Sequence, residues 1–208
     1  MISFAELVHS VKFERKGFRF FKVVEKDPTL KLVGMGRSAF VYRIQSTDKA
    51  MKIFFPSHVH WAQEEGAIYR ELKGIPYFPS IYQVGPNYLV LDYIEGDTLF
   101  EHLRKGIVIT EEKVKEVDKA LSIARERGLN PSDIHLRNII ITSKGEVKII
   151  DVARFRQNKN CRQWDDLKTA FYRFYHLPFF PKKIPAFILN LISSLYKKNL
   201  LLMKKEIV

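Results

Sequence analysis

The sequence predicts an α+β protein with two lobes, a strand-rich N-terminal lobe and a short helical C-terminal lobe. Short runs of β-branched and aromatic residues, bounded by Gly, Pro, Asn or Asp, recur as far as residue 93. After Gly96, apolar residues recur instead at spacings of three and four. A length of 208 residues, 46% of them hydrophobic, suffices for one sizeable core or two small ones.

The N-terminal lobe is expected to consist mainly of short strands. One helix interrupts them, from about residue 58 to residue 73, where Gly74 ends it and Pro76 follows. The strands are predicted at residues 18–24, 30–33, 39–45, 50–54, 81–84 and 88–93.

The C-terminal lobe is expected to hold three helices and one hairpin. Thr110 is the predicted N-cap of a helix that Gly128 ends. Two short strands, 139–142 and 147–150, flank a tight turn and predict a hairpin. Further helices are predicted at 164–175 and 186–202, and an apolar set is expected in the core of this lobe, namely Phe174, Phe179, Phe180, Phe187 and Leu191.

The chain carries a net charge of +12 and a pI of 9.7, which favours anionic partners. The excess is uneven, because residues 154–208 contribute +9 of it. Such lysines usually form a solvated face. The open alternative is a docking surface for a polyanion, either nucleic acid, a ribosomal particle or an anionic lipid.

One cysteine, Cys161, cannot form an internal disulfide, which favours a reducing compartment. The first residues lack the pattern of a secretory signal. Every apolar run is shorter than the roughly 20 residues needed to span a bilayer. A soluble, cytoplasmic protein without a transmembrane segment is therefore expected.

Two glycines, Gly34 and Gly36, lie at a turn between predicted strands, followed by Val41. Glycine lets the backbone approach a phosphate without a Cβ clash, so the turn is a candidate phosphate loop. A plain hairpin turn would have the same letters, and this alternative stays open.

Lys52 stands inside an otherwise apolar predicted strand. A buried ammonium is costly unless it is paired with anions. The following helix offers Glu65, which shares an inward face with Ile68, Tyr69 and Leu72. The alternative is an edge-strand lysine that points to solvent.

The block with the most chemistry contains Asp133, Asn138 and Asp151. The predicted hairpin lies between the last two and would return Asp151 beside Asn138. An acid and an amide placed together can hold Mg²⁺ through oxygen, while the other acid accepts a proton from a hydroxyl. The alternative is an Asx-rich turn followed by an aspartate at a strand end.

The order of these features resembles the protein-kinase-like superfamily over about residues 34–166, and it is most similar to small bacterial serine/threonine kinases and the compact, atypical RIO-type branch. This resemblance implies a bilobal kinase-like fold, with an N-terminal extension at 1–27, an N-lobe at 28–95 and a C-lobe at 96–208. It also implies an ATP-dependent phosphotransferase with Mg²⁺ or Mn²⁺ as cofactor and a protein serine or threonine as acceptor.

The resemblance assigns nucleotide-binding roles to the N-terminal half. Lys52 would hold the α- and β-phosphates and Glu65 would orient it, beneath the loop of Gly34, Gly36 and Val41. The hinge that meets adenine through backbone groups would be Asp92, Tyr93 and Ile94, after Leu91 as gatekeeper.

In the second half, the resemblance makes Asp133 the catalytic base and makes Asn138 and Asp151 the metal ligands. His135 stands where ordinary serine/threonine kinases have lysine, so we count it among the nucleotide-binding candidates. The same position makes the block similar to aminoglycoside and lipopolysaccharide kinases.

Other departures concern regulation and substrate. Ala39 replaces the third glycine, and Pro131 and Ser132 replace the His-Arg pair before the catalytic base, which argues against activation by loop phosphorylation. Only 15 positions separate Asp151 from Asp166, which resembles the buried aspartate of a following core helix. A long peptide-docking segment has no room there.

Three alternatives to a protein kinase remain from the sequence. A kinase of a sugar, antibiotic or lipid headgroup gains from His135 and the short segment. A nucleotide-binding pseudokinase usually lacks one of the key residues, whereas Lys52, Asp133, Asn138 and Asp151 are all present. A basic nucleic-acid-binding protein would be expected to show a recognisable binding motif.

Overall fold

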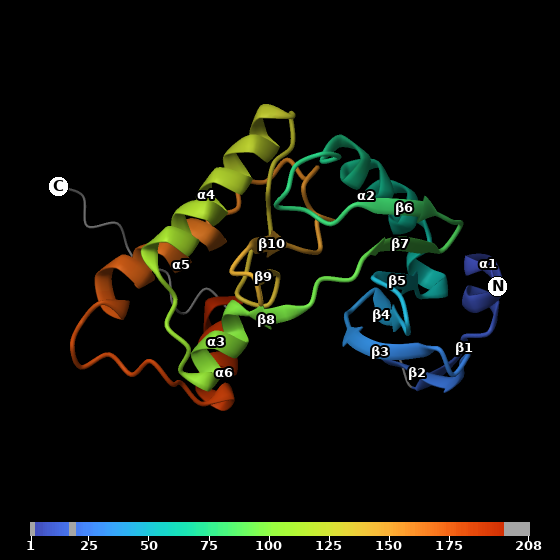
Figure 1. The fold of residues 1–208 in the computed structure, drawn as a ribbon, viewed down its shortest axis with the longest axis horizontal. Helices are drawn as coiled ribbons and strands as arrows, with labels where there is room; N and C mark the ends of the chain where they lie inside the picture. The colour runs from blue at the N-terminus through green and yellow to red at the C-terminus, as the bar shows by residue number, and fades with distance from the viewer. Residues whose placement is uncertain (1–2, 17–19, 198–208) are drawn as a thin grey trace. The chain divides into compact units, whose positions relative to one another are not determined.

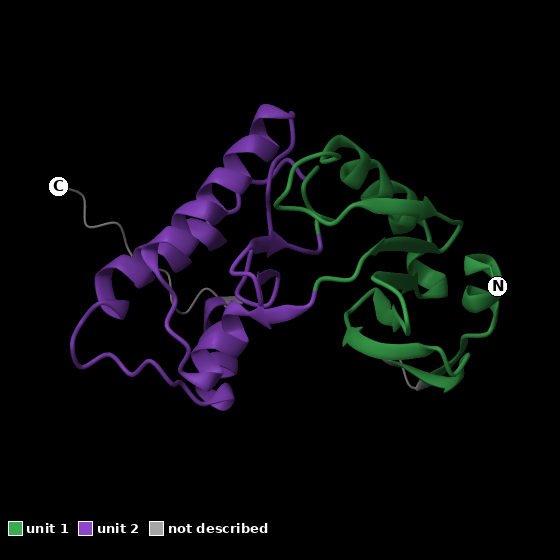
Figure 2. Ribbon diagram, viewed as in Figure 1, with its two compact units in different colours: residues 1–94, 152–156 green, residues 95–151, 157–208 purple. Residues whose placement is uncertain are grey.

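The computed structural model describes residues 3–16 and 20–197. It divides the chain into two compact units (Figure 2). Unit 1 comprises residues 1–94 together with 152–156, and unit 2 comprises residues 95–151 and 157–208. Unit 1 is rich in strands and unit 2 in helices, so the α+β class expected from the sequence is confirmed (Figure 1).

Unit 1 is built on a five-stranded antiparallel sheet. Its strands are β3 (Leu30–Met35), β4 (Ala39–Ile44), β5 (Lys49–Phe54), β7 (Tyr88–Asp92) and β6 (Ile81–Val84), in this spatial order. Each of them was expected from alternating or continuous apolar runs, within two residues at either end. The burial of β5 and β7 is nearly continuous because both lie inside the sheet.

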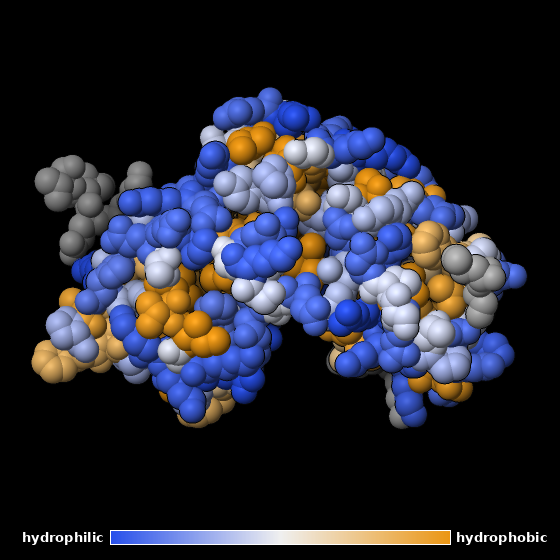
Figure 3. All heavy atoms as spheres, viewed as in Figure 1, coloured by the Kyte–Doolittle hydropathy of each residue, from blue (hydrophilic) through white to orange (hydrophobic). Residues whose placement is uncertain are grey.

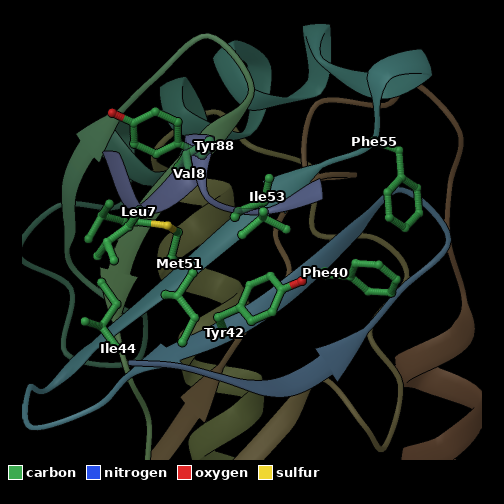
Figure 4. Packing of buried hydrophobic residues seen from close by; sticks show 12 residues of the cluster. Leu7, Val8, Phe40, Tyr42, Ile44, Met51, Ile53, Phe55 and Tyr88 are labelled. Atoms are coloured by element: carbon green, nitrogen blue, oxygen red, sulfur yellow. The ribbon is translucent and has the colours of Figure 1, made fainter. Parts of the chain in front are cut away.

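The N-terminal segment adds three elements to unit 1, namely α1 (Phe4–His9), β1 (Lys12–Lys16) and β2 (Phe20–Glu25). A capping box between Ser3 and Glu6 starts α1. Only the strand over residues 18–24 was expected; it corresponds to β2, and its first residues lie outside the described chain. Leu7 and Val8 of α1 join the buried cluster of Tyr42 and Met51 (Figure 4).

Aromatic side chains continue this cluster along one edge of the sheet. The ring of Phe55 lies 4.5 Å from that of Phe21 and 5.0 Å from that of Phe40, centroid to centroid. Phe13 of β1 packs edge-on against Phe55 at 5.7 Å. The described part of the segment predicted as an N-terminal extension therefore contributes to the core of unit 1.

Helix α2 (His60–Glu71) follows a short 3-10 turn, η1 (Pro56–His58), and matches the helix expected from 58 to 73. Gly74, with φ of 83°, follows it in the left-handed region. A Cβ on Gly66 would lie only 2.7 Å from Cγ2 of Val84, so this glycine lets α2 pack closely on β6.

Unit 2 contains a three-stranded sheet in the order β10 (Val147–Ile149), β9 (Ile139–Thr142), β8 (Gly96–Thr98). Its helices are α3 (Leu99–Lys105), α4 (Glu111–Glu126), α5 (Gln163–Ala170) and α6 (Ala186–Lys197), and a π-helix, η2 (Phe171–Tyr175), extends α5. The expected hairpin and helices are present, but β8 and α3 were not expected. Residues 198–202 of the last predicted helix lie outside the described chain.

Two expectations for unit 2 need correction. Thr110 takes the N-cap position of α4, but its side chain makes no capping hydrogen bond. The aromatic set expected in the core is largely at the surface: Phe179 is 97% exposed, and Phe174, Phe187 and Leu191 are exposed as well, with Phe180 only partly buried. Three prolines, at 178, 181 and 185, keep the segment that holds Phe179 and Phe180 from forming a helix. The other three residues lie in helices, Phe174 in η2 and Phe187 and Leu191 in α6, but on exposed faces of them.

The core of unit 2 forms around α4 instead. Val114, Val117, Leu121 and Ala124 are buried on one of its faces. Trp164 of α5 is buried and its indole N–H donates to Oδ1 of Asp118, 2.7 Å away. Among the residues that the structure describes, no helix is long and apolar enough to cross a membrane.

Candidate active site

The candidate phosphate loop is the turn between β3 and β4. The N–H of Gly36 donates to the carbonyl of Ala39 at 2.9 Å and closes this turn. A bulge after Leu32 shifts the register so that Gly34 pairs with Val41. A Cβ on Gly34 would come within 3.3 Å of Cβ of Val41, so glycine leaves open the space above that valine.

The sheet register aligns three of the predicted residues across neighbouring strands. Gly34 pairs with Val41, and Val41 pairs with Lys52. Directly paired residues of antiparallel strands point to the same face, so the side chains of Val41 and Lys52 share one face beside the glycine. The buried cluster of Tyr42 and Met51 lies on the opposite face of the sheet.

Lys52 and Glu65 form a buried ion pair within unit 1. The ammonium donates to both carboxylate oxygens at 2.8 Å. Their side chains are 10% and 1% exposed. The pairing expected from the sequence is therefore present, and Lys52 is not an edge-strand lysine in solvent.

The predicted hinge residues end unit 1. The carboxylate of Asp92 accepts hydrogen bonds from the N–H of Ser80 at 2.7 Å and from the hydroxyl of Tyr82 at 2.6 Å. The hydrogen bond from the Tyr82 hydroxyl to Asp92 raises the pKa of Tyr82 to about 12, and burial is the second cause of this shift. The side chain of Asp92 thus anchors the strand end, a role that the sequence did not reveal.

Backbone groups of the same segment are also engaged. The N–H of Asp92 donates to the carbonyl of Ser80 at 3.0 Å, and the N–H of Tyr93 donates to the carbonyl of Asp48 at 2.7 Å. A backbone donor for adenine from residues 92–94 would therefore have to be the N–H of Ile94.

Asp133 lies in a tightly held loop of unit 2. Its φ is 61°, in the left-handed region that non-glycine residues seldom adopt. Its N–H donates to Sγ of Cys161 at 3.4 Å, and its carbonyl accepts from Nδ2 of Asn138 at 3.0 Å. Both sides of this backbone are thus fixed, which holds the residue in its strained conformation.

A second clamp holds the start of this loop. Nδ2 of Asn130 donates to the carbonyls of Gln157 at 2.7 Å and Lys159 at 3.2 Å. With the bond from Asp133 to Cys161, residues 130–133 are thereby tied to residues 157–161. No local sequence pattern indicates this pairing, because Asn130 and its partners are more than 25 residues apart and lie in irregular segments.

The hairpin places Asp151 next to Asn138. Ile139 pairs with Ile149, and the N–H of Ile150 donates to the carbonyl of Asn138 at 2.8 Å. Asp151 is the next residue, is exposed and has a φ of 62°. The hairpin expected from the sequence is therefore confirmed, together with the juxtaposition that it was expected to produce.

The donor atoms of this pair suit a hard divalent cation. Asn138 uses its amide nitrogen on the carbonyl of Asp133, which leaves its amide oxygen as the group that could bind a metal. Asp151 adds a carboxylate. Groups of three or more His, Cys, Asp or Glu able to hold a metal are absent from residues 3–16 and 20–197. A site with few protein ligands fits Mg²⁺, which keeps waters and phosphate oxygens in its coordination shell.

The remaining predicted residues lie close by in sequence. The carbonyl of His135 accepts from the N–H of Asn138 at 2.8 Å, and its Nδ1 lies 3.3 Å from the N–H of Arg137.

Residues 152–156 belong to unit 1, where Phe155 packs edge-on against Phe78 and Arg156 pairs with Glu71 of α2.

Asp166, expected as a buried aspartate, is half-buried. It accepts a hydrogen bond from the hydroxyl of Tyr196 at 2.8 Å and lies 3.6 Å from the guanidinium of Arg162. Burial, followed by this bond to Asp166, raises the pKa of Tyr196 to about 12. Asp166 therefore ties α5 to α6 within unit 2.

Comparison with known proteins shows which family this chain resembles over nearly its whole length. The chain is 49% identical over 202 residues to a Bacillus subtilis (strain 168) protein named "Putative serine/threonine-protein kinase YrzF", covering 96% of this chain and 94% of that protein. The chain belongs to the protein-kinase-like superfamily. No family model matches it. The RIO-type branch is not tested by this similarity and stays a prediction.

More distant kinases match about two thirds of the chain. "Protein kinase C zeta type" of Oryctolagus cuniculus is 23% identical over 144 residues, 64% of this chain and 24% of that protein. A Clostridium perfringens (strain 13 / Type A) protein named as a probable serine/threonine-protein kinase is 29% identical over 140 residues, 59% of this chain and 20% of that protein. The likeness thus extends to kinases several times longer than this chain.

Proposed function

We propose that this protein transfers the γ-phosphoryl group of ATP to a serine or threonine hydroxyl of a protein, in the cytoplasm, with Mg²⁺ or Mn²⁺ as cofactor. The buried pair of Lys52 and Glu65 is the observation that carries the proposal. Such a pair gives little net stability, because desolvation offsets most of the attraction. The ion pair is explained if it holds a positively charged group in position to bind phosphate.

Unit 1 would hold the nucleotide. The ammonium of Lys52 would bind the α- and β-phosphates, with Glu65 fixing its orientation. Gly34 and Gly36 would let backbone N–H groups approach the phosphates, and Val41 would lie beside the base. The backbone of residues 92–94 would meet adenine through the N–H of Ile94.

Unit 2 would supply the proton acceptor and the metal ligands. The carboxylate of Asp133 would accept the proton of the attacking hydroxyl. The amide oxygen of Asn138 and the carboxylate of Asp151 would hold the cation, and His135 would lie beside the nucleotide. When bound, the cation neutralises charge on the transferred phosphoryl group.

A small-molecule acceptor is the second candidate, favoured by a specific observation. Residues 157–161, which follow the metal-site segment, are tied down by Asn130 and Asp133, and α5 starts at Gln163. This leaves no long segment after Asp151 on which a peptide could be laid. A sugar, antibiotic or lipid headgroup would need less surface.

Transfer from γ-labelled ATP tests the proposal. Wild type is compared with Asp133→Ala and with Asp165→Ala, a matched control at an exposed aspartate of α5. Acceptors are a generic basic protein and a panel of aminoglycosides and sugars. We expect labelled protein, a loss of at least about 100-fold in Asp133→Ala with ATP binding retained, and full transfer in Asp165→Ala.

Each other outcome identifies a different function. Label on small hydroxyl compounds alone would establish the second candidate. ATP binding without transfer to any acceptor would indicate a pseudokinase. Full activity of Asp133→Ala would contradict the role of that aspartate.

A further inference from the structure

Unit 2 carries a run of exposed apolar side chains between η2 and the middle of α6. Phe179 is 97% exposed and Phe187 is 71% exposed. Figure 3 shows hydrophobic residues at the surface of the end of unit 2 where Figure 1 draws the segment between α5 and α6. The whole set comprises Tyr172, Phe174, Leu177, Phe179, Phe187, Leu191 and Ile192. Exposed apolar residues are ordinary when scattered singly, but seven of them within residues 172–192 indicate an interaction surface.

In helix α6, the exposed apolar residues lie on a different face from the one that packs against the rest of unit 2. Its inward side is provided by buried Leu189, and Asn190 accepts a hydrogen bond from Arg137 at 2.9 Å. Phe187 and Leu191, four residues apart, therefore lie on another face, which is exposed. Helix α6 thus has an apolar face that unit 2 does not bury.

The same stretch has no acidic residue. Between residues 172 and 192 the sequence contains Arg173, Lys182 and Lys183 and no Asp or Glu. Arg173 and Lys183 are exposed among the apolar side chains. One acid from a neighbouring element faces the stretch, since Glu111 of α4 lies 3.7 Å from Nε2 of His176. The surface therefore combines apolar side chains with positive charge.

We propose that this surface docks on an anionic lipid bilayer. We call it the apolar-basic face and define it by Leu177, Phe179, Phe187, Leu191, Arg173 and Lys183. Protruding Phe and Leu beside Lys and Arg is the composition of segments that insert into the interface of a bilayer. Anionic headgroups complement its charge, with each basic residue near the surface worth about fivefold in affinity.

Other partners fit these features less well. Nucleic acid would take the positive charge but would leave most of the aliphatic side chains in water. A protein partner is expected to bring charge-matched acids together with a pocket for Phe179. The bilayer interface accepts both kinds of group without a shaped pocket.

Vesicle sedimentation of the full chain, without nucleotide, tests the proposal independently of any kinase activity. Wild type is expected to pellet with vesicles of phosphatidylcholine mixed with phosphatidylglycerol, but not with phosphatidylcholine alone. Added salt should weaken this binding because it screens the headgroup charge. Phe179→Glu and Phe187→Glu should each weaken binding by about tenfold or more.

Val24→Glu is the matched control, because Val24 is an apolar residue of β2 in unit 1 with 63% exposure. It should bind vesicles like wild type, and all three variants should retain the phosphotransfer activity of wild type. Equal binding to neutral and anionic vesicles, or unchanged binding by Phe179→Glu, would overturn the proposal.

Two further results would also overturn it. In the first, wild type and Phe179→Glu bind single-stranded RNA equally, and neither pellets with vesicles. This result would indicate a general polyanion site. The other is a dimer in sedimentation velocity that Phe179→Glu converts to monomer, again without vesicle binding, which assigns the face to a second copy.

Discussion

Replacing Lys52 by Met leaves the Glu65 carboxylate, 1% exposed, without its ammonium. At a separation of 2.8 Å the attraction amounts to about 6 kcal/mol at an effective dielectric constant of about 20. Taking each ion out of water costs several kcal/mol, so the intact pair contributes little net stability. Loss of one partner alone, by contrast, destabilises a protein by about 3–5 kcal/mol.

The two single variants should therefore behave unlike the double one. Lys52→Met and Glu65→Leu should each lower the free energy of unfolding of unit 1 by about 3 kcal/mol or more. The double variant K52M/E65L replaces both charges by apolar groups and should regain most of this loss. All three should lose phosphate transfer, since none keeps the positioned ammonium.

Urea unfolding followed by tryptophan fluorescence measures these differences. Trp61 lies in α2 of unit 1 and Trp164 in α5 of unit 2, so Trp61→Phe and Trp164→Phe backgrounds separate the two signals. Only the Trp61 transition is expected to shift. A double variant as unstable as the sum of the single ones would refute the desolvation argument, and transfer by K52M/E65L would refute the role of the pair.

Three further predictions concern other parts of the molecule. Tyr42→Phe should stabilise unit 1 by roughly 1 kcal/mol, because the buried hydroxyl has no hydrogen-bond partner among residues 3–16 and 20–197. Burial raises the pKa of Tyr42 to about 12, so the unfolded phenol loses its proton first and wild type should lose stability between about pH 10 and pH 12. Chemical unfolding at each pH should find a smaller loss in Tyr42→Phe, in which Tyr82 and Tyr196 still have a pKa raised to about 12. Asn130→Ala removes the bonds to residues 157 and 159 and should lower kcat by about tenfold with unchanged ATP affinity in a binding titration; a change in affinity alone would contradict this. Asp151→Asn should raise the Mg²⁺ concentration needed for half-maximal transfer by at least about tenfold, and an unchanged requirement would exclude Asp151 as a ligand.

The parts of the site that could be predicted were those set by local pattern. An isolated lysine in an apolar strand and a glutamate on the inward face of the next helix led to the pair of Lys52 and Glu65. The turn at residues 143–145 fixed the register that brings Asp151 beside Asn138. In both cases the spacing along the chain determines the geometry.

The parts that escaped prediction depend on distant contacts or on short elements. Strand β1 has the sequence KFERK, and its single aromatic residue produces no alternation of apolar and polar residues that would predict a strand. Helix α3 did carry signals, because Thr98 caps it and Gly106 ends it with φ of 78°, but seven residues give little periodicity. The aromatic residues after η2 were expected inside, since their composition resembles a core and only tertiary packing shows that they lie outside.

The positive φ of two aspartates bears on which residues suit those positions. Asp133 and Asp151 have φ of 61° and 62°, a region where an L-residue costs on the order of 1 kcal/mol and glycine costs almost nothing. Glycine at either position would relieve this backbone cost while removing the carboxylate. The roles proposed for these two carboxylates give a reason for acidic residues at positions where the backbone conformation favours glycine.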